Sequence, residues 1–307
     1  MTIEASTQAR PPASPANALL SSPILPTLLR LALPNAIAMF GTALVAVAET
    51  SYIGRLGVEP LAGIALVFPF VMLMQMMSAG AMGGGVSSAV SRALGGGNHE
   101  RAANLALHAA IIGTAGGLFF TATMLSLGRI FYSLLGGSGE VLEQAMQYSQ
   151  VLFSGAVSIW LVNTLASVVR GTGDMRVPSA VLIGVAIAQV TVGGGLGLGL
   201  FGLPKLGMRG VAAGQLTAFT LGALLLAWFL VSGRSRLTLN FRNFAFERDM
   251  FFDILKVGAM SCLSPLQTVL TIVIFTKILA SFGTVVLAGY GMGSRLEFLL
   301  VPIAFAF

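Results

Sequence analysis

Charged residues are scarce in this sequence, and cysteine is almost absent. Only 9% of the 307 residues are charged and 56% are hydrophobic, whereas about a quarter of a soluble domain is charged. A chain of this composition, with a mean hydropathy of +0.89, cannot cover its surface with polar groups, which excludes an ordinary water-soluble globular protein. The single cysteine, Cys262, excludes an internal disulfide and a metal site built from cysteines.

Histidine and the common catalytic motifs are also scarce. His99 and His108 are the only histidines, and neither an HExxH nor a GxSxG motif occurs. A GGSG stretch at 136–139 matches the short motif of rhomboid proteases, but Glu140 and Glu143 follow it in a polar loop. A membrane-embedded enzyme is therefore a remote alternative. The sequence predicts no metal site and no cofactor other than a coupling ion.

The basic excess is not gathered into a surface for nucleic acid. The net charge is +6 and the isoelectric point is about 10.1, yet no cluster of Lys and Arg is interleaved with aromatic residues. In a membrane protein such an excess usually lies in cytoplasmic loops, where it orients the helices. We therefore expect a lipid bilayer around this chain and no nucleic-acid partner.

Eight charge-free windows predict the membrane-spanning helices. A spanning helix needs about 20 mostly apolar residues, and every window reaches or approaches that length. The windows are 31–48, 60–91, 102–128, 144–169, 177–204, 210–233, 257–276 and 278–294. The fold class predicted is an all-α polytopic membrane protein, with the last span continuing beyond Arg295.

The polar segments divide the chain into four parts. Residues 1–27 contain five prolines and lack the basic start and apolar core of a secretory signal, so we expect a disordered cytosolic tail. Residues 28–233 hold six spans, 234–256 form an amphipathic linker on the cytosolic membrane surface, and 257–307 begin a second set. Basic residues flank the windows mainly on the side of the N-terminus, which places that terminus in the cytoplasm of an inner-membrane protein.

An internal repeat relates these two sets of spans. The stretch RLGVEPLAG at 55–63 aligns with SFGTVVLAG at 281–289, so that Gly57 meets Gly283 after 226 residues. Each stretch links the first and second helix of its set. Two six-helix halves in the same orientation are one of the repeat plans of secondary carriers. The sequence is therefore expected to be a fragment of a protein of about 450 residues, whose second half stops after two helices.

Four motifs, in this order and spacing, resemble the multidrug and toxic compound extrusion (MATE) family. They are LALPNAIAMFGTALVAVAETSYIGRLGVEPLAG, VSRALGGGNHERA, VVRGTGDMRVPSAV and LFGLPKLGMRGVAAGQLTA. The resemblance covers nearly everything after Leu28. It implies twelve helices in two six-helix lobes around a central cavity, which agrees with the repeat.

Glu49 is the strongest candidate for a functional residue. It lies near the end of the first span, where a carboxylate is costly and ionisable groups usually mark ion or substrate pathways. Burial favours the neutral acid, so such a group can take up and release a proton near physiological pH. The resemblance implies an aspartate at this place, and a bend at Pro34; Asn35 is a further candidate for the cavity wall. The alternative is an interfacial glutamate that reaches the outer surface.

Other acidic residues of the family are missing here. Some members carry an Asn and an Asp one turn apart in helix five, where this chain has Gln189 and Gly193; others carry a glutamate in helix seven, where it has Gln267. Gln189 and Gln267 are further candidates for the cavity. The choice between H⁺ and Na⁺ stays open. Arg295 and Glu297 lie in the eighth span, two residues apart and about 200° around the helix, so they are not expected to pair with one another. They form either salt bridges to another helix or part of the cavity.

The segment 170–174 predicts a structural turn between the fourth and fifth spans, which could also act as a gate. Arg170 complements the carbonyl end of one helix, Gly171 and Gly173 permit a tight turn, and Asp174 lies near the amino end of the next.

These observations predict a secondary antiporter, and not an enzyme. It exports hydrophobic or cationic drugs or toxic metabolites in exchange for H⁺ or Na⁺, by alternating access, and we expect a monomer. A flippase of lipid-linked precursors is the closer alternative, but pyrophosphate cargo demands cations in the cavity. The charge-free windows of the first six spans contain neither lysine nor arginine.

Overall fold

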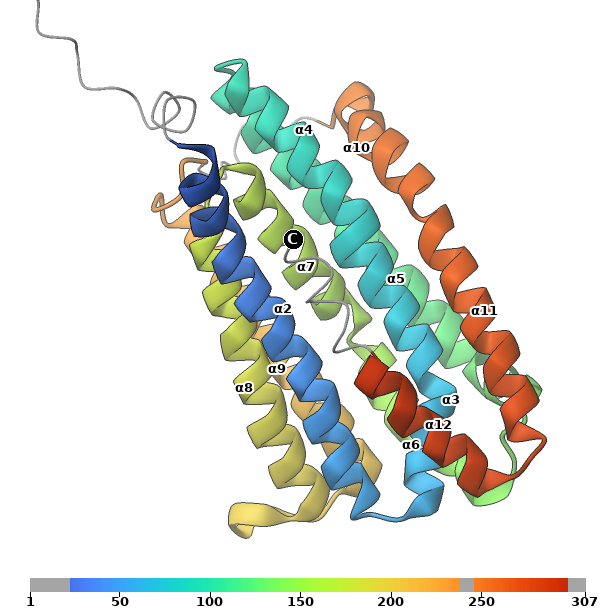
Figure 1. The fold of residues 1–307 in the computed structure, drawn as a ribbon. Helices are drawn as coiled ribbons and strands as arrows, with labels where there is room; N and C mark the ends of the chain where they lie inside the picture. The colour runs from blue at the N-terminus through green and yellow to red at the C-terminus, as the bar shows by residue number, and fades with distance from the viewer. Residues whose placement is uncertain (1–22, 238–245, 298–307) are drawn as a thin grey trace, which may run out of the picture.

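A computed structural model describes residues 23–237 and 246–297, and these residues form helices joined by turns and short links (Figure 1). In chain order they are α2 (Ile24–Gly54), α3 (Val58–Gln75), the π-helix η1 (Met76–Met82), α4 (Gly83–Gly95), α5 (His99–Leu134), α6 (Gly139–Ser154), α7 (Ala156–Gly171), α8 (Arg176–Leu198), the 3₁₀ turn η2 (Leu200–Gly202), α9 (Gly207–Val231), α10 (Arg248–Ser261), α11 (Leu263–Ala280) and α12 (Thr284–Glu297). The expected cytosolic tail, 1–27, and the terminus after 297 lie almost wholly outside the described residues.

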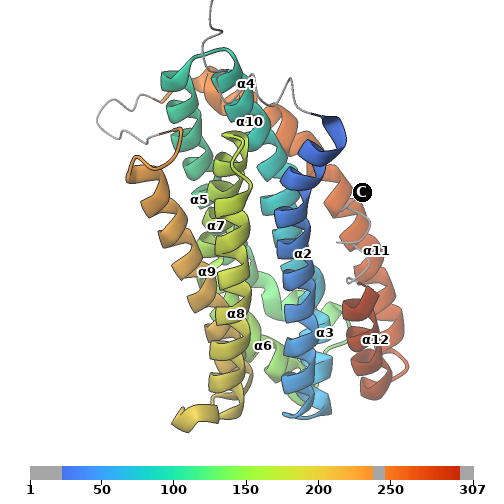
Figure 2. The same cartoon turned by 60° about the vertical axis from the view of Figure 1, so that its left-hand side comes forward.

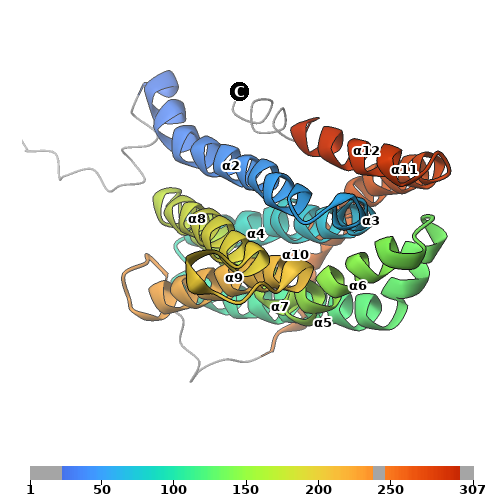
Figure 3. The same ribbon diagram turned by 90° about the horizontal axis from the view of Figure 1, so that it is seen from below.

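The long helices run side by side as one bundle (Figures 1 and 2). Helix α8 packs along both α2 and α9, and α7 packs against α4, α5 and α9. Helices α2–α9 form a first set. Helix α10 packs against α4 and α5, α11 packs against α3, and α12 also lies beside α3 (Figure 3). Helices α2–α9 and α10–α12, which correspond to the two sets of spans expected from the repeat, are therefore in contact.

Most of the predicted spans are present. Within the described residues, five helices are long and apolar enough to cross a membrane, from Val58–Gly95 to Arg248–Ala280, and the bent pair α6–α7 makes a sixth if it is counted as one span. Helix α2 has 31 residues, but side chains over much of its first half lie outside the described set. Helix α12 has 14 described residues. The all-α polytopic fold is confirmed.

Large apolar side chains cover the outside of the bundle as well as its core. Leu118 and Phe119 on α5, and Leu224 and Trp228 on α9, are all more than half exposed. A soluble monomer rarely exposes contiguous apolar surface on this scale. These faces suit contact with lipid, in agreement with the composition.

The second predicted span contains an irregularity that its sequence pattern does not reveal. Its helix passes through the seven-residue π-helix η1 before continuing as α4. A π-helix widens the turn and shifts the faces of the two flanking segments relative to one another. The span Val58–Gly95 is therefore one apolar helix whose two halves present different faces.

The fourth predicted span, expected as one helix over 144–169, is bent by 52° between α6 and α7. The bend lies at Gly155, where a β-carbon would collide with the side chain of Leu216 from α9. At the bend, the Thr121 hydroxyl donates a 2.7 Å hydrogen bond to the carbonyl oxygen of Phe153. A neighbouring helix thus supplies a donor to a backbone group released by the bend.

The boundaries around the second set differ from those expected. Helix α10 begins at Arg248, within the segment 234–256 expected as a surface linker, and its axis continues through Cys262 into α11. The reason is that Met250, Ile254 and Gly258 form a stripe that is buried against the first set of helices. The next turn follows Ala280 rather than Thr276, because residues up to Ala280 continue the apolar helix. Residues 238–245 of the linker lie outside the described residues.

Candidate functional site

Glu49 is buried between two helices near the carboxyl end of α2. It lies one and a half turns before the end of α2, on the face that packs against α8, and only 6% of its surface is exposed. Gln189 of α8 is 7% exposed and donates a 2.9 Å hydrogen bond from its Nε2 to Glu49 Oε1. The carboxylate is therefore held by a neutral amide contributed by a different helix.

This hydrogen bond has a specific electrostatic consequence. An isolated buried carboxylate is very costly, and a hydrogen bond from an N–H donor offsets part of that cost. The Gln189 amide can serve both protonation states, because its N–H donates to a carboxylate and its oxygen can accept from a carboxylic acid.

Tyr52 and Gly193 also lie at this site, next to one another. Tyr52 lies three residues after Glu49, hence on the same face of α2, and is 7% exposed. A β-carbon at Gly193 would lie 3.3 Å from both the Tyr52 hydroxyl and the carbonyl oxygen of Val211. The volume next to Gly193 is therefore occupied by a phenol and by the backbone of α9.

Close glycine contacts place α8 where Gln189 can reach Glu49. A β-carbon at Gly214 of α9 would overlap the backbone of Gly193, and one at Gly210 would overlap Leu196. Small residues at such points let two membrane helices approach closely. Gly193 thus allows α8 and α9 to pack closely.

The segment 170–174 forms the turn between α7 and α8. Gly171 is buried with no room for a β-carbon beside Ser87, and Gly173 has a φ of +85° that favours glycine. Asp174 Oδ1 accepts hydrogen bonds from the backbone N–H groups of Arg176, at 2.9 Å, and Val177, at 3.2 Å. It therefore satisfies two free donors at the start of α8. Arg170 donates to the hydroxyl of Ser167 at 3.2 Å.

The remaining predicted residues do not join Glu49 in the described structure. Gln267 lies on α11 and is exposed. Pro34 and Asn35 lie in α2, and Arg295 and Glu297 lie in α12, but their side chains are outside the described set. Among the described residues, no group of three or more His, Cys, Asp or Glu could hold a metal ion.

A second buried polar cluster was not predicted from the sequence. Asn163 of α7 donates from Nδ2 to Gln75 Oε1 at 2.9 Å and to Ser78 Oγ at 2.8 Å, and Ser78 in turn donates to the carbonyl of Met74. Asn163 and Ser78 are both buried. The cluster ties the π-helix η1 to α7. Polar residues within windows 60–91 and 144–169 were its only sequence signal, and they gave no indication that they would meet.

The comparisons with known proteins identify the family. The MatE family model matches residues 34–193, which is more than half of the chain. This chain belongs to the MatE family. The resemblance inferred from the four motifs is therefore confirmed, and so is the multi-pass helical membrane architecture. The match includes Glu49, Gln189 and Gly193 of this MatE protein.

Curated relatives of this MatE protein are transporters by name. A FAD transporter of Shewanella oneidensis is 29% identical over 296 residues, covering 94% of this chain and 64% of the relative. A probable multidrug resistance protein NorM of Thermotoga maritima is 26% identical over 282 residues, covering 91% and 60%. The chain thus spans less than two thirds of the length of these relatives.

Solved structures show the same fold in two conformations. An inward-facing multidrug resistance MATE family transporter of the MOP superfamily matches with a TM-score of 0.80 and 27% identity, over 88% of this chain and 63% of that chain. An outward-facing structure of such a transporter matches with a TM-score of 0.74 and 25% identity, over 96% and 71%.

Proposed function

We propose that this MatE protein is the larger part of a secondary antiporter that exports hydrophobic, neutral or cationic drugs or toxic metabolites. Export is driven by uptake of a cation at Glu49, and alternating access carries both across the membrane. The observation that supports this proposal above all is the buried carboxylate of Glu49, held by the amide of Gln189. Membership of the MatE family gives the transporter class.

A transporter couples two fluxes only if binding of one species changes the state that binds the other. Glu49 and Gln189 lie on two helices that pack against one another, so a change in the charge of Glu49 alters an interhelical contact. Similar folds occur in both inward-facing and outward-facing conformations, which supports an alternating mechanism. The charge of one buried side chain would then bias the choice between them.

We propose the proton as the coupling ion. Na⁺ is a hard cation that is usually held by several converging oxygen atoms, whereas Gln189 presents an N–H group to Glu49. A proton needs only one carboxylate. One proton entering across one pH unit and 100 mV releases about 3.7 kcal/mol, while a hundredfold gradient of a neutral compound costs about 2.8 kcal/mol.

The lack of basic residues in the predicted spans also indicates the class of cargo. The predicted spans of the first half contain no lysine or arginine that would bind a pyrophosphate, which argues against lipid-linked precursors. Relatives named as a multidrug resistance protein and a multidrug export protein support drugs or toxic metabolites, whereas the relative named as a FAD transporter is named for a compound that carries a pyrophosphate. We further propose that the protein acts as a monomer in the inner membrane, with its N-terminus in the cytoplasm, and that it needs no cofactor besides its coupling ion.

The test is efflux of a fluorescent cationic dye from energised vesicles at matched expression. Glu49→Gln keeps the size of the side chain but cannot ionise, so it should abolish gradient-driven efflux while leaving dye binding partly intact. Glu49→Asp should retain efflux. The matched control is Glu59→Gln, which changes an exposed glutamate at the start of α3 and should pump normally.

Two results would contradict the proposal. Efflux at the parental rate by Glu49→Gln would show that this carboxylate does not couple the ion. Efflux that collapses on removal of a Na⁺ gradient, and persists without a pH gradient, would make Na⁺ the coupling ion instead.

A further inference from the structure

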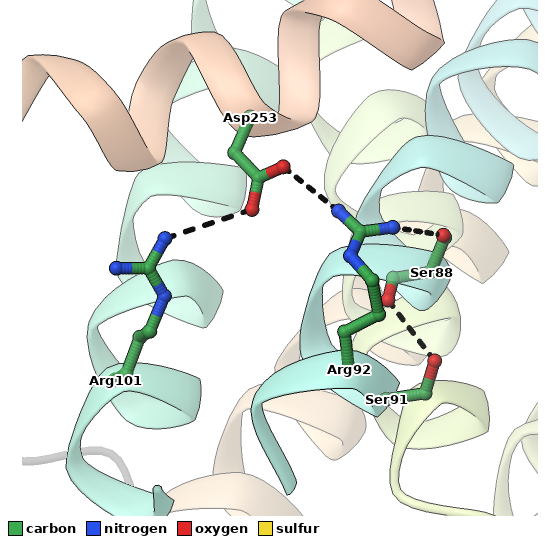
Figure 4. A network of polar contacts seen from close by, with 5 residues as sticks. All are labelled: Ser88, Ser91, Arg92, Arg101 and Asp253. Carbon is green, nitrogen blue, oxygen red and sulfur yellow. Dashed lines mark hydrogen bonds and ion pairs between the residues drawn. The ribbon is translucent and has the colours of Figure 1, made fainter. Parts of the chain in front are cut away.

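Asp253 of α10 lies between two arginines from two other helices at the expected cytosolic end of the bundle (Figure 4). Its Oδ1 is 2.8 Å from Arg92 Nη2 at the end of α4, and its Oδ2 is 3.7 Å from Arg101 Nη2 at the start of α5. Both arginines belong to the first set of helices, whereas α10 opens the second set. One carboxylate therefore connects the two sets.

His108 makes a second contact between the same two sets of helices. Its Nδ1 lies 2.7 Å from the carbonyl oxygen of Asn104, and a carbonyl can only accept, so Nδ1 carries the hydrogen. Its Nε2 accepts a 2.9 Å hydrogen bond from the backbone N–H of Glu247, the residue before α10. The imidazole is fully buried, and its centroid is 5.3 Å from that of Phe246.

Beneath these polar contacts the backbones of α4 and α10 nearly touch. A β-carbon at Gly85 would lie 2.9 Å from the carbonyl oxygen of Ile254 and 3.0 Å from the nitrogen of Gly258. A β-carbon at Gly258 would overlap Met82, which is 8% exposed. This contact, called the seam, also buries the side chains of Met250 and Ile254, and the ion pairs lie at its rim.

The strength of the rim suits a contact that opens and closes. The side chains of Arg92, Arg101 and Asp253 are 51%, 41% and 34% exposed. Ion pairs with this exposure are weak and screened by salt. Alternating access in repeat-built carriers moves one repeat against the other around the binding site. The ion pairs at the rim can therefore break and re-form at little cost.

From these contacts we infer that Asp253 is a positioning residue for transport: its clasp on Arg92 and Arg101 holds the cytosolic side of the seam shut and releases once per transport cycle. We call Asp253, Arg92 and Arg101 the clasp. The hydrogen bond between His108 and Glu247 is a second contact between the same two sets of helices. The inference rests on the proposed antiport function, because it assigns the clasp a place in that cycle.

The experiment measures access to the seam from the cytosolic side. The full chain carries Cys262→Ala, so that Met82→Cys supplies the single thiol, and inside-out vesicles are treated with an impermeant maleimide. Asp253→Asn should raise the labelling rate of the residue-82 thiol, by up to about tenfold. Asp253→Glu keeps the carboxylate and should restore slow labelling. Asp249→Asn, an exposed acid on the same helix, is the matched control.

Two further arms separate opening from unfolding. Leu152→Cys replaces Met82→Cys as a reporter in the fully buried core of α6, where labelling should stay slow. Raising the ionic strength should accelerate labelling at 82 in the chain with Asp253 intact, and have little effect in Asp253→Asn. Equal labelling in Asp253→Asn and Asp249→Asn, no effect of salt, or a parallel rise at 152 would each overturn the clasp.

The labelling needs neither dye nor gradient, so the two proposals fail independently. An unchanged labelling rate would overturn the clasp and leave the role of Glu49 standing. In the opposite case, normal efflux by Glu49→Gln would overturn that role and leave the labelling result standing. If the clasp acts in the cycle, Asp253→Asn should lower the maximal efflux rate more than it changes the apparent KM, and Asp253→Glu should recover it.

Discussion

The amide of Gln189 in α8 donates a 2.9 Å hydrogen bond to the carboxylate of Glu49 in α2, across 140 residues of sequence. Both side chains are buried, so the contact excludes most water. Their contact joins α2 and α8 of this MatE protein through one ionisable side chain. It also defines which neighbours must be changed to test the coupling.

Replacing Gln189 should slow transport without unfolding the protein. Gln189→Leu fills a similar volume but leaves Glu49 without this donor, and a hydrogen bond to a charged group contributes about 1.5–3 kcal/mol. We therefore expect efflux at least about tenfold slower than that of the parent. Thr191→Val, two residues along the same helix and exposed, is the control. An unchanged rate in Gln189→Leu would show that the amide is dispensable.

Adding a methyl group where α8 and α9 touch should destabilise the bundle. Gly214→Ala places a β-carbon into the backbone of Gly193, so the helices must separate, and we expect a loss of about 1–3 kcal/mol or more. Gly184→Ala, on α8 with nothing within 4 Å of its β-carbon, should hold or raise the stability. Thermal unfolding of the purified proteins in detergent compares them. Equal thermal unfolding midpoints for Gly214→Ala and Gly184→Ala would mean that α8 and α9 do not pack tightly at Gly193.

The orientation of the chain predicts which loops an external reagent reaches. In a Cys262→Ala background, Ser138→Cys in the exposed turn between α5 and α6 should react with an impermeant thiol reagent added to intact cells. Ser232→Cys, exposed after α9, should react only after the cells are opened. Reaction of the residue-232 thiol in intact cells would reverse the proposed topology.

Local features of the sequence predicted much of the fold, because they need no partner. Low charge and long apolar windows specify membrane helices, since every backbone polar group in lipid must be satisfied within its own segment. The turn at 170–174 was predicted in detail, since its glycines and the Asp174 cap act within a few residues. The cost of a carboxylate in an apolar window likewise singled out Glu49 before any neighbour was known.

Other features depend on which helices meet, and only the tertiary structure decided them. The π-helix η1, the bend at Gly155 and the extension of α10 back to Arg248 arise from packing against Asn163, Leu216 and the α4 seam. The π-helix and the bend leave no periodic signal in their own segments, and the amphipathic pattern at 234–256 did not show which surface α10 would pack against.

For Glu49, what the sequence determines can be separated clearly from what the tertiary structure adds. The sequence by itself determined that an ionisable group lies in an apolar span, with Gln189 and Gly193 as the residues of the fifth span expected near it. Only the tertiary structure decided what surrounds it: Gln189 donates to its carboxylate, and Tyr52 and the backbone of α9 occupy the volume beside Gly193. The physical reason is that burial cost is a property of one segment, whereas hydrogen bonds and shared volume depend on how closely two distant backbones approach.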